Sequence, residues 1–226
     1  MARDFQKLER VLSQARFNSY KRPGKSESDA FNLYLWNTTL CESLYASFQI
    51  LEVGVRNTIH SEISKEFADK EWIKNEHSKL LDYEKEAAKE AKMSLNKRMV
   101  RCEEPELVAE MSFGFWTGIL DTRYEMLWHK ITAGTFPYAP KALRNRAEIS
   151  RRMNAARKLR NAAFHHHSIW HWRDLKNQHQ GIRELIRWIC PSLDEMAYTI
   201  DRFPKTFRLG VRECARISGE PCEYEI

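Results

Sequence analysis

The sequence predicts an all-α fold, and three observations carry this prediction. Apolar side chains recur at helical spacing over most of the 226 residues, and no run of useful length alternates polar and apolar residues as a β-strand does. The chain has eight Gly and seven Pro, which is few for a β-rich protein that needs many tight turns. Hydrophobic residues make up 42% of the sequence and include seven Trp, so the helices can bury a sizeable core.

A short amphipathic helix is expected first, over residues 4–16. Its apolar side chains fall on one helical face and are Phe5, Leu8, Val11 and Leu12. The stretch KRPGKSES at residues 21–28 is rich in helix breakers and ends in candidate N-cap residues. We therefore expect a loop there, followed by a new helix.

The longest predicted helix covers residues 29–67, where Gly54 alone breaks the pattern. Its apolar residues recur at three- to five-residue steps and are Phe31, Leu35, Leu40, Leu44, Phe48, Leu51, Val55 and Ile59. This spacing fits one long helix or two collinear ones.

Further helices are expected toward the C-terminus. Residues 76–99 carry Glu and Lys at helical i,i+4 spacing, which is typical of a solvent-facing helix. Residues 103–120 are denser in apolar side chains and contain the core string MSFGFWTGIL, whereas FPYAPKA at residues 136–142 is a loop punctuated by Pro. The remaining predicted helices cover residues 143–164, 177–189, 192–200 and 205–217.

Basic residues gather in the C-terminal half. Between Lys141 and Arg216 there are 17 Lys and Arg against seven Asp and Glu, whereas between Ser61 and Glu110 there are ten bases against 13 acids. A basic segment of this kind fits a polyanionic partner such as RNA. A solvated, Arg-rich helical surface explains the composition equally well.

The sequence favours a cytoplasmic protein. Five cysteines form no CxxC pair and are odd in number, so we expect free thiols in a reducing compartment. The N-terminus MARDFQKLERV has no apolar run of signal-peptide length, and no segment approaches the ~18 apolar residues of a membrane span. We therefore expect no membrane partner.

The stretch RNAAFHHHSIWHW, residues 160–172, is the strongest candidate for chemistry. If the helix before it extends to this point, Arg157, Asn161 and His165 recur every four residues and drift slowly around one face. Arg160 flanks that face, so R-x4-H places a permanent cation and a titratable imidazole near one helix C-terminus. The partial negative charge of such a terminus favours a protonated histidine.

An Arg–His pair suits cleavage of RNA by its own 2′-hydroxyl. Histidine has an unperturbed pKa of about 6.5 and can take or give a proton near neutral pH. Arginine can donate two parallel hydrogen bonds to phosphate oxygens and stabilise the charge that accumulates there. No metal or other cofactor is required, because the substrate carries the nucleophile. The alternative is an Arg and a His that merely bond a helix end, since the same string arises by chance.

A zinc site is a further alternative. His165, His166, His167 and His171 could supply ligands, and the last two have the i,i+4 spacing of one helical face. Adjacent histidines on a helix point about 100° apart, however, and cannot all reach one ion. No Cys or carboxylate pair at ligand spacing supports them, so we predict no bound metal.

Four separated blocks of the sequence have an order and spacing typical of one family. They are YLWNTTLCESLYASFQILEVGVRNTI (residues 34–59), AEMSFGFWTGILDTRYEMLW (109–128), RKLRNAAFHHHSIWHW (157–172) and LIRWICPSLDEMAYTIDRFPKTF (185–207). Together they resemble the Abi-like (AbiD/AbiF-type) abortive-infection proteins of the HEPN group, over roughly residues 10–208. The third block is similar to that family's "RxLRNRIAHHEPIW" motif.

The resemblance implies a fold and a domain organisation. The fold is a HEPN-type helical bundle with additional helices. One domain covers residues 1–226, with its core at about residues 27–208, the helix at 4–16 before it and a short C-terminal extension after it. The resemblance also implies a homodimer, in which two copies bring their motifs to one composite cleft.

The resemblance also implies an activity. HEPN proteins include metal-independent ribonucleases of phage defence and toxin–antitoxin systems, so RNA is the expected substrate. Arg160 and His165 correspond to the Arg and His of the HEPN motif, and Asn161 to the polar residue after the Arg. A small RNA or a protein antitoxin could be a further partner.

A second constellation supports this site. Glu52-x3-Arg56-Asn57 resembles an E-x3-(K/R) element of some HEPN families. At i,i+4 spacing the two charged groups share one helix face, where Glu52 could orient Arg56 or His165. An ordinary intrahelical ion pair is the alternative, but the apolar residues on either side favour a role in the site.

Four further residues are candidates for contacts with RNA or with the helix end. Arg157 and Lys158 are candidate RNA contacts on the basic helix. His166 could touch the substrate or could cap the helix. Trp170 could stack on an unpaired base, although packing in the core is favoured for it.

The motif departs from the family pattern after His166. His167 and Ser168 stand where an acid and a proline are usual, and Ala162 replaces a basic residue. If the acid normally orients the catalytic histidine, its loss would weaken or retune cleavage. A non-cleaving RNA-binding HEPN protein, regulated by a bound small RNA or antitoxin, is therefore the alternative function.

Overall fold

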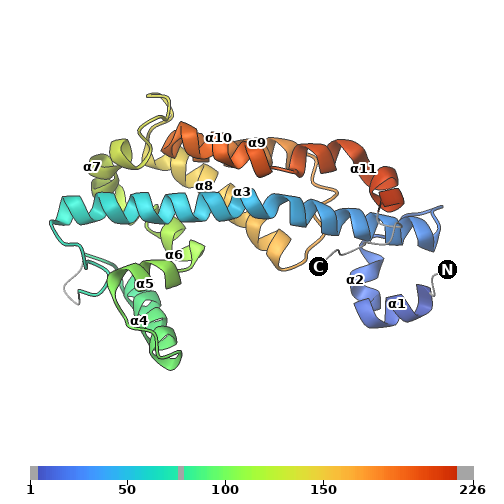
Figure 1. Cartoon of the computed structure of the whole chain (residues 1–226), viewed down its shortest axis with the longest axis horizontal. Coiled ribbons are helices and arrows are strands. Elements are labelled where there is room, and N and C mark those ends of the chain that lie inside the picture. The colour runs from blue at the N-terminus through green and yellow to red at the C-terminus, as the bar shows by residue number, and fades with distance from the viewer. Residues whose placement is uncertain (1–4, 76–78, 218–226) are drawn as a thin grey trace. The chain divides into compact units, whose positions relative to one another are not determined.

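The computed structural model describes residues 5–75 and 79–217, and every regular element in these ranges is helical (Figure 1). The all-α prediction is therefore confirmed. The elements are α1 (Phe5–Leu12), α2 (Gln14–Asn18), α3 (Glu27–Phe67), α4 (Asp82–Lys97), α5 (Glu104–Glu110), α6 (Phe113–Gly118), the 3-10 turn η1 (Thr122–Tyr124), α7 (Glu125–Thr135), α8 (Arg146–Phe164), α9 (Leu175–Ile189), α10 (Pro191–Ile200) and α11 (Phe203–Ile217).

The first predicted helix is interrupted at Ser13. This residue has φ 69° and ψ 138°, so α1 ends before it and α2 begins after it. The Ser13 hydroxyl accepts a hydrogen bond from the Arg16 N–H at 3.3 Å and caps α2. The prediction of one helix over residues 4–16 is therefore wrong, because Ser13 leaves the helical conformation and caps a second helix although the amphipathic pattern continues. Residue 4 lies outside the described residues.

α3 is one continuous helix of 41 residues, so the single-helix form of the prediction is confirmed (Figure 1). Ser26 starts it: its hydroxyl accepts from the Asp29 N–H at 3.1 Å, and the Asp29 carboxylate accepts from the Ser26 N–H at 3.0 Å. This reciprocal pair is a capping box. Gly54 does not break the helix; a Cβ there would lie 3.1 Å from Leu193, so glycine permits close approach of α10.

Most of the later helices also follow the prediction. α8 to α11 begin within one to three residues of their expected starts, and α4 lies inside the predicted stretch 76–99, of which residues 76–78 are outside the described ranges. The dense segment 103–120 forms α5 and α6. The helix α7 was not predicted, because its sequence EMLWHKITAGT lacks a clean helical pattern of apolar residues.

The chain divides into two compact units that alternate along the sequence. The first unit comprises residues 5–46, 159–179 and 200–217, and the second comprises residues 47–158 and 180–199. The helices α3, α8 and α9 each contribute residues to both units. The single domain expected over residues 1–226 stays a prediction.

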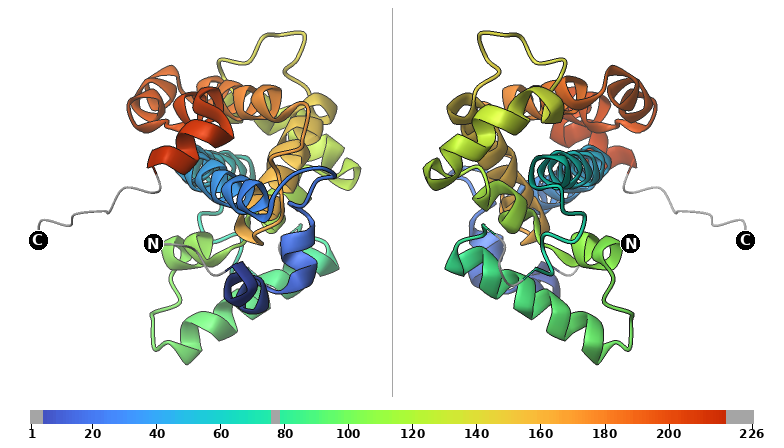
Figure 2. Two further views of the ribbon diagram at one scale, coloured as in Figure 1. Left: turned by 90° about the vertical axis from the view of Figure 1, so that its right-hand side faces the viewer. Right: turned by 90° about the vertical axis from the view of Figure 1, so that its left-hand side faces the viewer.

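The first unit has a small aromatic core. Phe17, Tyr20, Ala30 and Leu33 are buried, and partly buried aromatic side chains pack against them. α1 packs against α2 beside this core (Figure 2). α11 is kinked at Gly210, whose φ of 70° suits a glycine.

The second unit is built around stacked aromatic rings. Trp72, Phe115 and Trp116 are each 1% exposed, and the last two meet edge to face with ring centroids 5.0 Å apart. The predicted core role of the MSFGFWTGIL segment is thus confirmed. α4 packs against α5 in the same unit (Figure 2).

Two further findings concern the described residues alone. No helix among them is long and apolar enough to cross a membrane. Cys41, Cys102 and Cys190 are free thiols, as expected.

Candidate active site

The Arg and the His of the candidate motif lie at the C-terminal end of α8. Asn161 lies in its last turn, Arg160 directly precedes that turn, and His165 follows its last residue. Ala162 and Ala163 are buried, at 8% and 5% exposure, whereas His165 is exposed. The helix therefore ends with one buried face and presents an imidazole to solvent.

The helix end is closed by a Schellman motif. The His166 N–H donates to the Ala163 carbonyl at 3.1 Å, and the His167 N–H donates to the Ala162 carbonyl at 2.8 Å. Two of the carbonyls expected to attract a protonated histidine are therefore already bonded. The motif also fixes the direction in which the chain leaves α8.

His166 takes the left-handed position of this motif, with φ 59°. Glycine usually fills such a position, because a side chain there costs about 1 kcal/mol or more. Of the two roles predicted for His166, capping the helix fits its position in the helix-ending turn, and contact with a substrate stays a prediction. The residue sits at the turn itself, and its backbone carbonyl accepts a hydrogen bond from Arg16 Nη1 at 3.1 Å.

Asn37 of α3 holds the loop that follows the turn. Its Oδ1 accepts from the backbone N–H groups of Ile169 at 2.7 Å and Trp170 at 3.1 Å, and its Nδ2 donates to the His167 carbonyl at 3.4 Å. Asn37 is 3% exposed. One buried amide thus ties the histidine loop to a helix that precedes it by more than 130 residues in the sequence.

Sequence reasoning missed Asn37, although a signal for it existed. Leu33, Leu40 and Leu44 are buried on the same helical face, and Asn37 falls on that face between them. A lone amide on a buried face must find hydrogen-bond partners there. That requirement could have marked Asn37 as a positioning residue, but it could not have named its partners.

The Arg160 side chain lies along the helix. Its Nη1 donates to Asn161 Oδ1 at 3.3 Å, and its guanidinium carbon lies 4.6 Å from the centroid of the Phe164 ring. Phe164 in turn meets Tyr45 edge to face at 5.8 Å. The cation is therefore oriented by an amide and by an aromatic face, whereas the predicted role of Asn161 in a catalytic site stays a prediction.

The three consecutive histidines are all exposed, and two of their rings are close. The ring centroids of His165 and His167 lie 6.4 Å apart, with the planes tilted by 43°. Two imidazoles at this separation can reach opposite sides of one phosphodiester. The arrangement can therefore supply a base and an acid from one loop.

Trp170 packs inward. It is partly buried against the core of the first unit, and the Arg22 guanidinium carbon lies 4.1 Å from its ring centroid. This placement fits the favoured core role. Its predicted contact with RNA stays a prediction.

The other predicted site residues belong to the second unit: Glu52, Arg56, Asn57, Arg157 and Lys158. Arg56 Nη1 donates to the backbone carbonyl of Ala109 at 3.3 Å, and Arg157 Nη2 donates to Asn154 Oδ1 at 3.1 Å. The supporting role of Glu52, Arg56 and Asn57 stays a prediction, as do the RNA contacts of Arg157 and Lys158.

The zinc interpretation gains no geometric support. Among the side chains that the structure describes, those of residues 6–75 and 79–212, no three from His, Cys, Asp or Glu are grouped so that they could hold a metal ion. The three histidines follow the last residue of α8 and pass through the turn at His166, so the helical divergence on which the prediction rested does not apply to them.

Comparisons with models of protein families, with curated proteins and with solved structures find no match. The similarity to Abi-like HEPN proteins therefore stays a prediction based on the four sequence blocks. What the structure adds is the local geometry: an oriented Arg, its neighbouring Asn and paired exposed histidines at one capped helix end.

Proposed function

We propose that this protein is a metal-independent endoribonuclease of a phage-defence system, of the abortive-infection or toxin–antitoxin kind. The observation that carries the proposal is the end of α8, where Asn161 and Phe164 orient Arg160 and where the exposed rings of His165 and His167 lie close together. The basic C-terminal half and the similarity to HEPN proteins support RNA as the substrate.

The chemistry assigns one task to each group. His165 takes the proton of the RNA 2′-hydroxyl, and the 2′-oxygen attacks the adjacent phosphorus. The bond between phosphorus and the 5′-oxygen breaks, and that oxygen takes up a proton from His167. The ring centroids of His165 and His167 lie 6.4 Å apart. Arg160 stabilises the charge on the phosphate oxygens. The products are a 2′,3′-cyclic phosphate and a 5′-hydroxyl, and DNA is not a substrate because it lacks the 2′-hydroxyl.

A homodimer is part of the proposal. Two copies would bring two Arg–His motifs to one cleft, as the similarity to HEPN proteins implies. A small RNA or a protein antitoxin would keep the cytoplasmic enzyme silent until infection.

The alternative is an RNA-binding protein without cleavage. It is favoured by one specific feature, the replacement of the family's acid and proline by His167 and Ser168. Under this alternative the basic surface holds RNA and the loop has lost its catalytic task.

The test is incubation of purified protein with labelled total RNA in EDTA, for the native chain and for Arg160→Ala and His165→Ala. Each variant should cleave about 100-fold more slowly or worse, because it lacks a group that acts on the reacting phosphate. His171→Ala and Arg173→Ala are matched controls, since both residues are exposed in the same region outside the motif. Their rates should stay close to native.

Binding separates the two functions. His165→Ala should keep most of its RNA affinity, and that affinity should fall as salt is raised. Salt-sensitive binding by a native chain that never cleaves would establish the alternative. Native cleavage that persists in both motif variants would exclude the proposed site.

A further inference from the structure

The second unit contains an open pocket of about 1010 Å³, and of the described residues that line it Asn57 is the one that is also among the predicted ribonuclease-site residues. It lies at the C-terminal end of α3 and is closed by the turn after α3 and by the start of α5. Its polar wall includes His60, Ser64 and Glu104, and its apolar wall includes Ala68, Pro105 and Val108. A pocket of this size can hold a small organic molecule.

Glu104 is a buried carboxylate with one unused oxygen. Its side chain is 7% exposed, and Oε1 accepts a hydrogen bond from the Ile73 N–H at 3.2 Å. Oε2 is buried and has no hydrogen-bond partner among the described residues. Burial raises the pKa of Glu104 above its ordinary value, as expected for a carboxyl group removed from water.

His60 does not neutralise this carboxylate. Its Nδ1 lies 3.9 Å from Glu104 Oε1 and accepts a hydrogen bond from Trp72 Nε1 at 3.0 Å. An Nδ1 that accepts carries no proton, so the ring is the neutral tautomer. Burial also lowers the pKa of His60 below its ordinary value, which keeps the ring neutral at neutral pH.

Two lysines line the pocket, Lys65 and Lys70. Lys65 Nζ is paired with Glu62 at 2.5 Å, and Lys70 is exposed to solvent, which screens its charge. Ser64 also lines the pocket, and within the described ranges its buried Oγ lacks a hydrogen-bond partner. The lining therefore contains a carboxylate oxygen and a hydroxyl that are both buried and, in the described structure, both without a partner.

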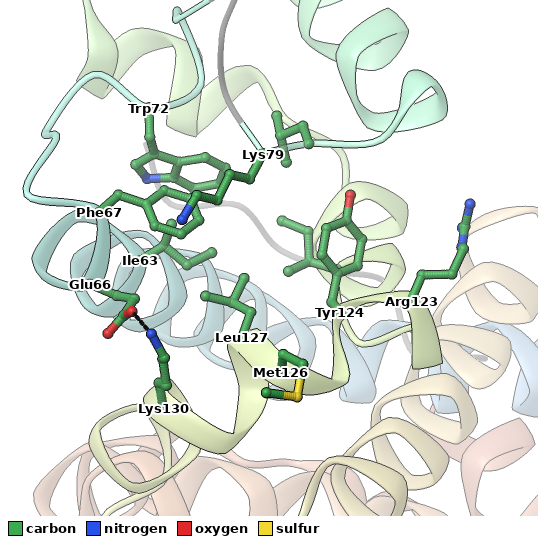
Figure 3. Close-up of a pocket in the computed structure, with 12 residues that line it drawn as sticks. Ile63, Glu66, Phe67, Trp72, Lys79, Arg123, Tyr124, Met126, Leu127 and Lys130 are labelled. Carbon is green, nitrogen blue, oxygen red and sulfur yellow. Dashed lines mark hydrogen bonds and ion pairs between the residues drawn. The ribbon is translucent and has the colours of Figure 1, made fainter.

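A second cavity of the same unit, shown in Figure 3, makes a useful contrast. It has a volume of about 240 Å³ and an apolar lining that includes Ile63, Phe67 and Leu127. Its charged groups are already engaged: Glu66 pairs with Lys130, and Lys79 Nζ lies 5.0 Å from the Phe67 ring centroid (Figure 3). A polar ligand would therefore find no unpaired charged group among these residues, whereas Glu104 has a carboxylate oxygen without a hydrogen-bond partner in the described structure.

We propose that the Glu104 pocket is a binding site for a small aliphatic amine, whose ammonium group pairs with the Glu104 carboxylate. A cation suits the site because an ionised carboxylate accepts hydrogen bonds and cannot donate them. The methylene groups of the ligand would lie along Ala68, Pro105 and Val108. Glu103, exposed at the same pocket, could meet a second ammonium group, which makes a short diamine the best-fitting class.

Calorimetric titration of the purified full chain with putrescine tests this proposal. RNA must first be removed at high salt, because diamines bind RNA directly. The native chain should bind putrescine, and Glu104→Gln should weaken binding about tenfold or more, since the charge-assisted hydrogen bond is lost. Glu86→Gln is the matched control: it removes the same charge from an exposed position of the second unit that does not line the pocket, and should weaken binding by no more than about threefold.

Three outcomes would overturn the proposal. They are no binding at millimolar putrescine, equal weakening by both substitutions, or equal binding of the uncharged analogue 1,4-butanediol. A second readout covers a folding failure: in the native chain, putrescine should shift the indole N–H resonance of Trp72, which is bonded to His60 beside Glu104. None of these results depends on ribonuclease activity, so this proposal and the proposed function fail independently.

Discussion

The ends of α8 and α3 close in the same way but treat their buried polar groups differently. At both ends a non-glycine residue takes the left-handed position of a Schellman motif, His166 with φ 59° and Ala68 with φ 51°. After α8, the buried amide of Asn37 bonds the loop through both of its ends. Beside the end of α3, the buried Glu104 leaves one oxygen without a partner in the described structure.

The difference separates two uses of a buried polar side chain. Asn37, whose amide is hydrogen-bonded to the loop, fixes one loop conformation. Any other conformation would leave the N–H groups of Ile169 and Trp170 without an acceptor. An unsatisfied group such as Glu104 lowers stability but keeps its hydrogen-bonding capacity for a ligand. The same kind of helix-ending turn can thus be followed by a loop held in one conformation, as after α8, or lie beside a pocket with an unpaired polar atom, as after α3.

The largest expected effect comes from Asn37→Ala, which removes the satisfied group. We expect the free energy of unfolding to fall by about 2–3 kcal/mol, because the N–H groups of Ile169 and Trp170 lose their acceptor. Urea unfolding measures the loss, and hydrogen exchange at those two amides should accelerate. RNA cleavage should also fall, since the histidine loop loses its anchor.

Thr38→Ala is the control for that substitution. Thr38 is the next residue of α3, is exposed, and donates within the helix to the Tyr34 carbonyl. Its replacement should leave both stability and cleavage nearly unchanged. If Asn37→Ala left the hydrogen exchange of the Ile169 and Trp170 amides unaltered, Asn37 would not be the clamp that holds the histidine loop.

Glu104→Gln should raise the free energy of unfolding at neutral pH, whereas Asn37→Ala should lower it. Because burial raises the pKa of Glu104, the folded chain binds this proton more tightly than the unfolded chain. The stability conferred by that proton is present at acid pH and is lost as pH rises through the raised pKa. In the absence of ligand, the substitution should therefore stabilise the fold by about 1 kcal/mol at neutral pH.

The pH dependence sharpens this prediction. The gain from Glu104→Gln should disappear as pH falls below the ordinary glutamate value of 4.5, where the native carboxyl is also neutral. Thermal unfolding across this range provides the measurement, with Glu103→Gln as the exposed control. A substitution that destabilised the protein equally at every pH would show that the carboxylate is not the source of the penalty.

The smallest effect is expected for His166→Gly. Glycine adopts the left-handed conformation without the cost of a side chain, so the free energy of unfolding should rise by about 0.5–1 kcal/mol. The melting temperature should rise accordingly. His167→Gly is the matched control, because His167 has no positive φ and gains nothing from glycine. If both substitutions lowered the melting temperature alike, the turn at His166 would carry no strain.

Local patterns were sufficient to predict the long helices but not the features that shape the site. α3 and α8 follow from apolar periodicity and from a capping box at Ser26, all of which are encoded by near neighbours. The break at Ser13 went unpredicted because the amphipathic pattern continues through it. α7 was missed because two of its four buried residues are Thr132 and Thr135, so its apolar residues alone show no clean helical pattern.

The candidate site divides along the same line. Arg160, Asn161 and His165 could be found because they are neighbours in a recognisable string. The clamp by Asn37 and the left-handed turn at His166 could not, since both are set by contacts across the fold. Likewise, the sequence shows Glu104 as one of several acids in a charged stretch and says nothing of its unpaired oxygen.

The contact between Asn37 and Ile169 also has a consequence for synthesis of the chain on the ribosome. The two residues are 132 positions apart, so the histidine loop cannot be anchored until the ribosome has added the residues up to Ile169. Closing so long a loop is entropically slow, and contacts of this kind form late in folding. A partly made chain would therefore carry α3 without an anchored histidine loop. Any activity that depends on this loop would begin only after the chain has been made to that point.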